Sequence, residues 1–190
     1  MARGFLVAVV AVVAIAVVAA GGTAVMVGHR VIGSSMTPTL MDGELLAANP
    51  LDHRPARFDV VVLRRSTGPI ELVKRVIAVG GDRVRIVPTP SGAQAQVSPS
   101  GSSRWFAVVT AGGTPGSGGA GSCCAPDGRA SGAPAAVRVP DGWFFVLGDN
   151  PDVSIDSRTF GFVPADAVRA VVLGQLWPPA RLPGGYRLVD

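Results

Sequence analysis

The stretch from Phe58 to Val87 reads FDVVVLRRSTGPIELVKRVIAVGGDRVRIV, and it decides the fold class. Its apolar runs are short and rich in valine and isoleucine, and turn residues at 66–69 and 80–82 separate them. Runs of this kind between glycine and proline indicate β-strands. We therefore predict strands over residues 58–63, 70–77 and 83–87, with two of them paired as a hairpin.

The same pattern continues toward the carboxyl end. Trp143–Leu147 is a strongly apolar run, and residues 170–176 form another that stops at the prolines of 177–179. Residues 88–140 are instead dense in glycine, serine, proline and alanine, which predicts a loop-rich insertion with a short hairpin around Trp105. The fold class is therefore predicted to be mainly β, as an antiparallel, β-rich domain.

A long uncharged segment precedes this domain. Residues 5–28 are mostly valine and alanine and contain no charged side chain. A helix of roughly 24 residues is about 36 Å long, enough to cross a bilayer core, whereas a cleaved signal peptide has an apolar region of only about 7 to 15 residues. We therefore predict one uncleaved transmembrane helix within residues 1–30, followed by a folded domain over residues 31–190.

The charge and the cysteines exclude some classes of function. The net charge is +4, and its 17 basic residues are scattered rather than gathered into a tract, so we expect no nucleic-acid partner. The two cysteines, Cys123 and Cys124, are adjacent and lack the spacing of metal ligands. A vicinal disulfide and two loop thiols remain alternative interpretations of this pair.

Lys74 is the most informative polar residue, because it interrupts the branched run 70–77. On an exposed edge strand it would be an ordinary surface lysine. Buried, it would have a lowered pKa, and a neutral amine beside a serine hydroxyl activates that serine without histidine. Ser35 is the candidate serine. The two histidines, His29 and His53, lie beside the apolar segment and in a proline-flanked loop, which makes lysine the better partner.

Three polar segments, in order, resemble the signature blocks of the signal peptidase I family. They are residues 35–40 (Ser-Met-Thr-Pro-Thr-Leu), residues 74–76 (Lys-Arg-Val) and residues 148–161, which contain Gly-Asp-Asn and Ser-Ile-Asp-Ser-Arg-Thr-Phe-Gly. Each block alone is common, but three in this order behind an apolar segment are specific. The resemblance leaves out the insertion at 88–140.

The resemblance implies a role for each matching residue. Ser35 matches the nucleophile, Lys74 the general base, and Ser154 the hydroxyl that orients the lysine. Charged pairs are implied between Asp149 and Arg75 and between Asp156 and Arg158. The substrate would lie extended against apolar side chains, which we expect at Val31, Ile32, Met36, Leu40, Leu72 and Val73, although core packing explains these six equally well.

One departure from the family pattern concerns the oxyanion site. Gly33 stands two residues before Ser35, where some members carry a serine that helps to bind the oxyanion; glycine resembles the Gram-positive branch. The second oxyanion donor is therefore undetermined, and the Ser35 backbone N–H is a candidate for the first.

The resemblance implies a membrane-bound endopeptidase that cuts signal peptides from exported pre-proteins after small residues, as in Ala-x-Ala. We expect a monomer in the plasma membrane, in contact with lipid, with its catalytic domain outside the cytoplasm and no metal or cofactor. Two alternatives stay open: a processing peptidase with one dedicated substrate, and an inactive, membrane-tethered peptide-binding module. A self-cleaving regulator of the LexA type would need a DNA-binding domain ahead of the serine, where the apolar segment stands.

Overall fold

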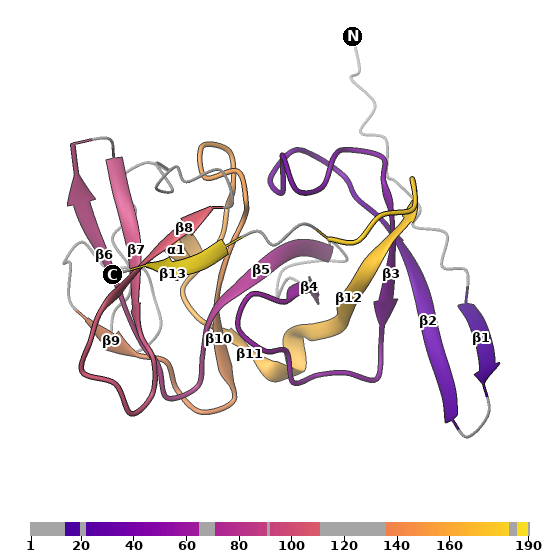
Figure 1. The fold of residues 1–190 in the computed structure, drawn as a ribbon, viewed down its shortest axis with the longest axis horizontal. Coiled ribbons are helices and arrows are strands. Elements are labelled where there is room, and N and C mark those ends of the chain that lie inside the picture. The colour runs from indigo at the N-terminus through magenta and orange to yellow at the C-terminus, as the bar shows by residue number, and fades with distance from the viewer. Residues whose placement is uncertain are drawn as a thin grey trace, which may run out of the picture.

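The protein is built from two antiparallel β-sheets, as a computed structural model shows (Figure 1). The structure describes residues 14–19, 22–64, 71–90, 92–110, 136–182 and 186–189. The elements are β1 (Ala14–Ala19), β2 (Gly22–Arg30), β3 (Leu45–Asn49), β4 (Val60–Arg64), β5 (Glu71–Val79), β6 (Arg83–Thr89), β7 (Gly92–Ser98), β8 (Phe106–Thr110), β9 (Val137–Arg138), β10 (Trp143–Leu147), α1 (Ser157–Phe160), β11 (Val163–Pro164), the 3₁₀ turn η1 (Ala165–Ala167), β12 (Val168–Trp177) and β13 (Tyr186–Val189).

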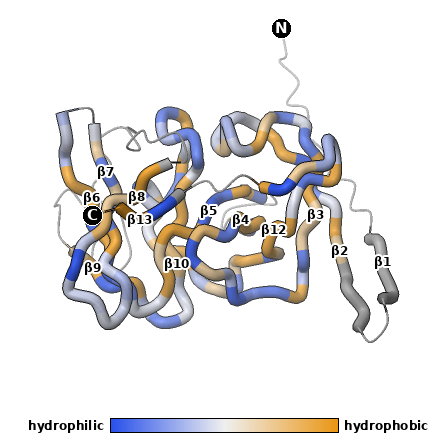
Figure 2. The backbone as a smooth tube through the Cα atoms, viewed as in Figure 1, coloured by the Kyte–Doolittle hydropathy of each residue, from blue (hydrophilic) through white to orange (hydrophobic). Residues whose placement is uncertain are grey.

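The first sheet has the strand order β1-β2-β3-β12-β4-β5-β10-β11. Its central strand β4 is buried on both faces, because Val60 and Val62 join one apolar cluster while Val61 and Leu63 join another. Figure 2 shows the resulting apolar colour along β4 and β12. A strand covered on both sides needs a continuous apolar run rather than an alternating one, which is what residues 60–63 supply.

The second sheet has the strand order β13-β8-β7-β6-β9 and lies at the opposite end of the molecule from β1 and β2 (Figure 1). A third apolar cluster joins the sheets, with Ile77 and Phe145 from the first and Val84 and Val97 from the second. The chain passes between the sheets through the turn at residues 80–82. There the buried carboxylate of Asp82 accepts two hydrogen bonds from Arg57 and others from the backbone N–H groups of residues 79 and 100.

The strands predicted from branched residues are confirmed. The predicted segments 58–63, 70–77, 83–87, 143–147 and 170–176 overlap β4, β5, β6, β10 and β12. β4 and β5 pair as an antiparallel hairpin, with Val61 opposite Lys74. The prolines at 178 and 179 follow the last residue of β12 directly, as expected.

The predicted transmembrane helix is wrong for the described residues of the apolar segment. Residues 14–19 and 22–30 form strands β1 and β2, and β2 also pairs with β3, from Val27 opposite Ala48 to Arg30 opposite Leu45. Valine and glycine are weak helix formers, and an uncharged run of branched residues suits a strand as well as a helix. None of the helices in the described ranges is both long and apolar enough to cross a bilayer.

The described part of residues 88–140 contains more strand than the loop-rich interpretation predicted, and residues 111–135 lie outside the described residues. Residues 92–98 and 106–110 are strands β7 and β8, which pair with each other, and Trp105 stands just before β8, so the expected hairpin is present. In β7, alanine and valine face the core while glutamine faces outward, a strand alternation of low hydrophobicity. Cys123 and Cys124 lie outside the described residues.

Candidate active site

Ser35 and Lys74 meet although 39 positions separate them in the chain. Ser35 lies half-buried in the turn that follows β2, and Lys74 lies on β5 with 2% of its surface exposed. Lys74 Nζ donates a hydrogen bond of 2.7 Å to Ser35 Oγ. The sequence contains no other lysine, so the single amine side chain of the protein is the one placed against this serine.

The surroundings of Lys74 lower the pKa of its amine from the usual 10.5. The main cause is burial, because removal from water penalises the charged ammonium. The carboxylates of Asp156 and Asp149 act in the opposite direction and raise this pKa, and the Arg158 guanidinium lowers it. The amine is therefore easier to deprotonate than a surface lysine.

The loop after β10 holds the backbone of the serine turn. The Asn150 backbone N–H donates to the Ser35 carbonyl at 3.0 Å, and the Asn150 side chain donates from Nδ2 to the Ser34 carbonyl, also at 3.0 Å. Asn150 belongs to the Gly-Asp-Asn motif, which by itself predicts no role for this side chain. The signal was present in that motif, yet only the fold shows that this side chain reaches Ser34.

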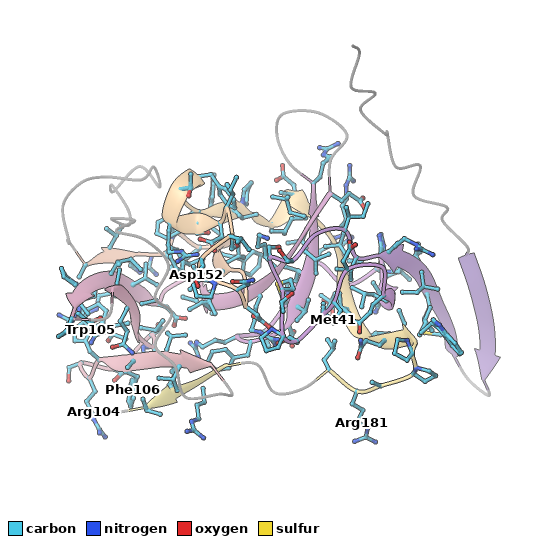
Figure 3. All side chains as sticks on the ribbon, turned by 90° about the horizontal axis from the view of Figure 1, so that it is seen from above. Met41, Arg104, Trp105, Phe106, Asp152 and Arg181 are labelled. Carbon is cyan, nitrogen blue, oxygen red and sulfur yellow. The ribbon has the colours of Figure 1, made fainter. Side chains whose placement is uncertain are left out.

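Gly148 lies in close contact with the same turn. A Cβ atom at this position would collide with the Ser154 side chain and lie 2.5 Å from the Ser35 carbonyl oxygen. Only a residue without a side chain therefore allows the loop to approach the serine. Figure 3 places this loop, marked by Asp152, between the Trp105 end of the second sheet and the Met41 turn of the first.

The first predicted charged pair, Arg75 with Asp149, is present. Arg75 Nε and Nη2 donate to the two carboxylate oxygens of Asp149 at 2.9 and 2.6 Å, and both side chains are almost fully buried. Arg75 Nη1 also donates to the Phe58 carbonyl at 2.9 Å. The pair joins β5, next to Lys74, to the loop that contacts Ser35.

The second predicted pair, Asp156 with Arg158, is also present and serves the loop itself. Arg158 donates to Asp156 through Nε and Nη2, both at 2.8 Å. Asp156 also caps α1 and accepts a hydrogen bond from the Gly148 N–H at 3.0 Å. Its carboxylate therefore folds the loop back onto Gly148 rather than onto the strand of Lys74.

Ser154 reaches the site but does not make the bond that the family resemblance implied. Its Oγ is buried and has no hydrogen-bond partner, so it does not bond to Lys74. Its closeness to Gly148 places it beside the serine turn.

Gly33 adopts a positive φ of 89°, a conformation that favours glycine. Its N–H donates to Asp42 Oδ1 at 2.8 Å, and no atom lies within 4 Å of the point where a Cβ would stand. Among the hydrogen bonds of the described residues, none uses the Ser35 N–H as donor. That N–H therefore remains a candidate oxyanion donor.

The structure divides the six apolar residues that we expected around a substrate. Val31, Met36 and Leu40 pack in the core with at most 3% of their surface exposed, so their side chains are occupied by packing. Leu72 and Val73 are half-buried, and Ile32 is 61% exposed. Of this set, Ile32 has the most surface available for a substrate.

The comparison with known families agrees with the motifs. The family model described as signal peptidase, peptidase S26, matches residues 3–94 and 122–177, well over half of the chain. The chain belongs to the signal peptidase family, peptidase S26. It is accordingly a hydrolase, a serine peptidase of the signal peptidase I type. Strands β8 and β13 fall outside the matched ranges.

Individual relatives of this signal peptidase family member come from bacteria and from plants. The chain is 32% identical over 175 residues to signal peptidase I of Bacillus caldolyticus, a match that covers 87% of each chain. It is 30% identical over 155 residues to the mitochondrial ATP-independent inner membrane protease subunit 1a of Arabidopsis thaliana, covering 79% of this chain and 70% of that one. It is 28% identical over 165 residues to signal peptidase IB of Staphylococcus aureus, covering 83% and 81%.

A solved signal peptidase I from Enterococcus faecalis is 22% identical to the chain. Its match has a TM-score of 0.42 and covers 62% of this chain and 96% of that one.

Proposed function

We propose that the protein removes signal peptides from exported pre-proteins, with Ser35 as nucleophile and Lys74 as general base. The observation that carries the proposal is the 2.7 Å separation of Lys74 Nζ and Ser35 Oγ at a buried position. An inactive peptide-binding module would have no need of a buried amine against a hydroxyl. Burial that favours the neutral amine supplies the base that a serine needs in the absence of histidine.

The reaction is acyl transfer in two steps. Neutral Lys74 accepts the Ser35 proton while Oγ bonds to the scissile carbonyl carbon, and the oxyanion forms beside the Ser35 N–H. The carbon–nitrogen bond then breaks, and the protonated Lys74 gives the proton to the leaving amine. Water, deprotonated by the same lysine, adds to the ester carbon and releases Ser35 with its proton restored.

Ser154 and the two charged pairs support this geometry in the proposal. Arg75–Asp149 ties the strand of Lys74 to the loop, and Asp156–Arg158 shapes that loop around Gly148. Ser154 has an unpaired buried hydroxyl that lies against Gly148, beside the serine turn. In the proposed reaction, none of these groups forms or breaks a covalent bond with the substrate.

For the substrate we propose an extended segment with small residues at the first and third positions before the cut. It would pair with backbone near the end of β2 and along β5, where exposed Ile32 and half-buried Val73 stand. Backbone pairing holds many sequences equally, so selection would rest on shallow pockets that admit only small side chains.

We further propose that residues 1–30 attach the protein to the plasma membrane as a monomer, with residues 31–190 outside the cytoplasm. The uncharged composition of residues 5–28 supports attachment, since apolar side chains are favoured in lipid over water; residues 14–19 and 22–28 of this run are paired strands and not a spanning helix. The name of the Arabidopsis relative places that protein in an inner membrane. Alkaline extraction of membranes and protease accessibility in intact spheroplasts test the attachment and the side.

The dyad is tested with the full chain in detergent, incubated with a model pre-protein whose cut site is mapped by mass spectrometry. We expect Ser35→Ala and Lys74→Ala each to lower kcat by roughly 10⁴-fold or more, with the domain still folded. Ser102→Ala, in the connection between β7 and β8, is the control that keeps full activity. Substantial activity in either dyad variant would refute the proposal. A cut confined to one pre-protein of a panel would favour the dedicated processing peptidase.

A further inference from the structure

The Asn150 side chain acts on the peptide group that joins Ser34 to Ser35. Its Nδ2 donates to the Ser34 carbonyl oxygen at 3.0 Å. That carbonyl and the Ser35 N–H belong to one planar peptide group and point in opposite directions. The Thr37 backbone N–H donates to the same oxygen at 3.2 Å, so these two hydrogen bonds together fix the direction in which the Ser35 N–H points.

The same bond also changes the strength of the Ser35 N–H as a donor. A donor placed on a carbonyl oxygen draws electron density through the conjugated peptide, and successive hydrogen bonds in a chain strengthen one another by roughly 10–30% each. The Ser34 carbonyl carries no proton and can only accept, which settles which end of the Asn150 amide faces it.

A second contact prevents the peptide plane from rotating. The Asn150 backbone N–H donates to the next carbonyl, that of Ser35, at 3.0 Å. One residue thus holds two successive carbonyl groups on either side of the Ser35 Cα. The Ser35 N–H is left without an acceptor among the hydrogen bonds of the described residues.

The neighbouring position increases the importance of this N–H. Gly33 has no side-chain hydroxyl, so it offers no side-chain donor to an oxyanion. A site with fewer donors depends more on the direction and polarity of each one, because donors that are fixed in advance need no reorganisation as charge develops.

We propose that Asn150 is a positioning residue that orients and polarises the Ser34–Ser35 peptide, so that the Ser35 N–H stabilises the oxyanion of the transition state. This inference rests on the proposed function, in which Ser35 is the nucleophile. Asn150 itself touches no reacting atom.

The kinetic test compares Asn150→Ala and Asn150→Asp with Ser35→Ala in the same detergent-solubilised full chain. We expect Asn150→Ala to lower kcat roughly 10- to 100-fold with KM nearly unchanged, somewhat less than the loss of a whole oxyanion donor. Asn150→Asp should lower kcat further, because its carboxylate repels the Ser34 carbonyl. Asn49→Ala is the matched control, since Asn49 is the only other asparagine and, among the bonds of the described residues, its side chain only accepts one from the exposed Leu51 N–H.

A second measurement distinguishes an effect on the orientation of the Ser35 N–H from a general loss of order in the active site. A peptide aldehyde ending in Ala-x-Ala accepts Ser35 Oγ at its carbonyl carbon, and the aldehyde oxygen then takes the oxyanion position. In Asn150→Ala its inhibition constant should rise by the same factor as kcat/KM falls. The affinity for an uncleavable peptide of the same sequence should not change, and neither should the midpoint of the low-pH limb of kcat/KM.

Each outcome has one meaning. If Asn150→Ala retains kcat within two-fold while Ser35→Ala is inactive, the inference is wrong and the proposed function stands. If Ser35→Ala is active, the proposed function itself fails. Should the Asn150 variants not fold, the wild type labelled at the Ser34 carbonyl carbon, the Ser35 nitrogen and the Asn150 side-chain amide nitrogen provides the test. A through-bond coupling from Asn150 Nδ2 to the Ser34 carbonyl supports the inference, and its absence in a spectrum that shows the neighbouring coupling overturns it.

Discussion

Arg75 and Asp149 face each other between β5 and the end of β10, joined by two parallel hydrogen bonds of 2.9 and 2.6 Å. Both side chains are about 97% removed from solvent, and Arg75 is the immediate neighbour of Lys74. In this arrangement the charges are compensated only by contacts within the protein, so loss of one partner leaves the other ionised and buried. The pair therefore couples the stability of the fold to the position of the proposed base.

We expect Asp149→Ala to destabilise the protein by about 3–5 kcal/mol, because the buried guanidinium of Arg75 would lose the carboxylate that compensates its charge. For a chain of this size, that corresponds to a fall in melting temperature on the order of 10 °C. Asp141→Ala is the control, since its pair with Arg138 is largely exposed and is worth about 0–1 kcal/mol. Equal melting temperatures for the two variants would contradict the assignment of Arg75–Asp149 as a structural pair.

Gly148→Ala should lower kcat about 100-fold, because the added methyl group displaces either Ser154 or the backbone of Ser35. Gly28→Ala is the matched control: its added methyl group would lie 3.6 Å from a Leu45 methyl group, an ordinary contact. Combining Gly148→Ala with Ser154→Gly should restore part of the activity, since one of the two obstacles is then removed. A Gly148→Ala single variant with full activity would show that residue 148 does not lie in close contact with Ser154 and the Ser35 carbonyl.

The pH dependence should show one group titrating below the usual range of lysine. Burial lowers the pKa of Lys74, so the neutral base is present at lower pH, and kcat/KM should rise with pH to a plateau. Asp156 raises this pKa, so Asp156→Asn should move the rising limb to lower pH. Because Lys74 is the only lysine, its side-chain ¹⁵N signal can be titrated directly. A limb that moves upward in Asp156→Asn would contradict this electrostatic assignment.

The same pKa makes a prediction for stability. The folded-state pKa lies below that of the unfolded chain, so between the two values the unfolded chain binds more protons at this site. The Lys74 contribution to the free energy of unfolding should therefore rise with pH across that window and be constant below it. Lys74→Met should lose this slope, and it should be more stable than the wild type below the window, where burying the ammonium is costly. Chemical denaturation at several pH values measures both effects; an unchanged slope in Lys74→Met would place its origin elsewhere.

The second sheet should contribute stability without contributing to catalysis. The Trp105 ring lies 4.2 Å from the Arg85 guanidinium carbon and 5.3 Å from that of Arg83, measured to the ring centroid. Trp105→Ala should destabilise the protein by about 1–2 kcal/mol, since each such contact contributes about 0.5–1 kcal/mol at a surface. kcat and KM should stay within two-fold of the wild type. A large loss of kcat at full thermal stability would instead tie this strand to the active site.

The sequence predicts the strands well where branched side chains are buried. Residues 60–63 and 144–147 are apolar throughout and buried, and their short length between turn residues favours strands over helices. Strand β7 was not predicted from a run of this kind. Its alternating alanine and glutamine have the two-residue period of a strand, but the segment has little hydrophobicity. The uncharged amino-terminal run is hard to assign for a different reason, because its hydrophobicity suits both a helix and a strand. In the structure, the pairing of β2 with β3 favours the strand.

The site was predicted in part because its residues are recognisable by type and order. Ser35, Lys74 and the two charged pairs follow from motif resemblance, and the structure brings them together. No rule of spacing predicts that residue 35 meets residue 74, since that contact depends on the tertiary fold that brings the turn after β2 to β5. The bond from Asn150 to Ser34 is equally nonlocal, and the sequence does not reveal that the Ser154 hydroxyl makes no bond to Lys74.

The order of synthesis gives the Asn150 contacts a further consequence. The ribosome makes the serine and the lysine early, but the segment that clamps the serine backbone follows β10 near the end of the chain. A nascent polypeptide thus carries the Ser35 hydroxyl and the Lys74 amine before the loop that completes their site has been made. Proteolytic competence would appear only on completion of folding, which protects neighbouring proteins from a half-made enzyme.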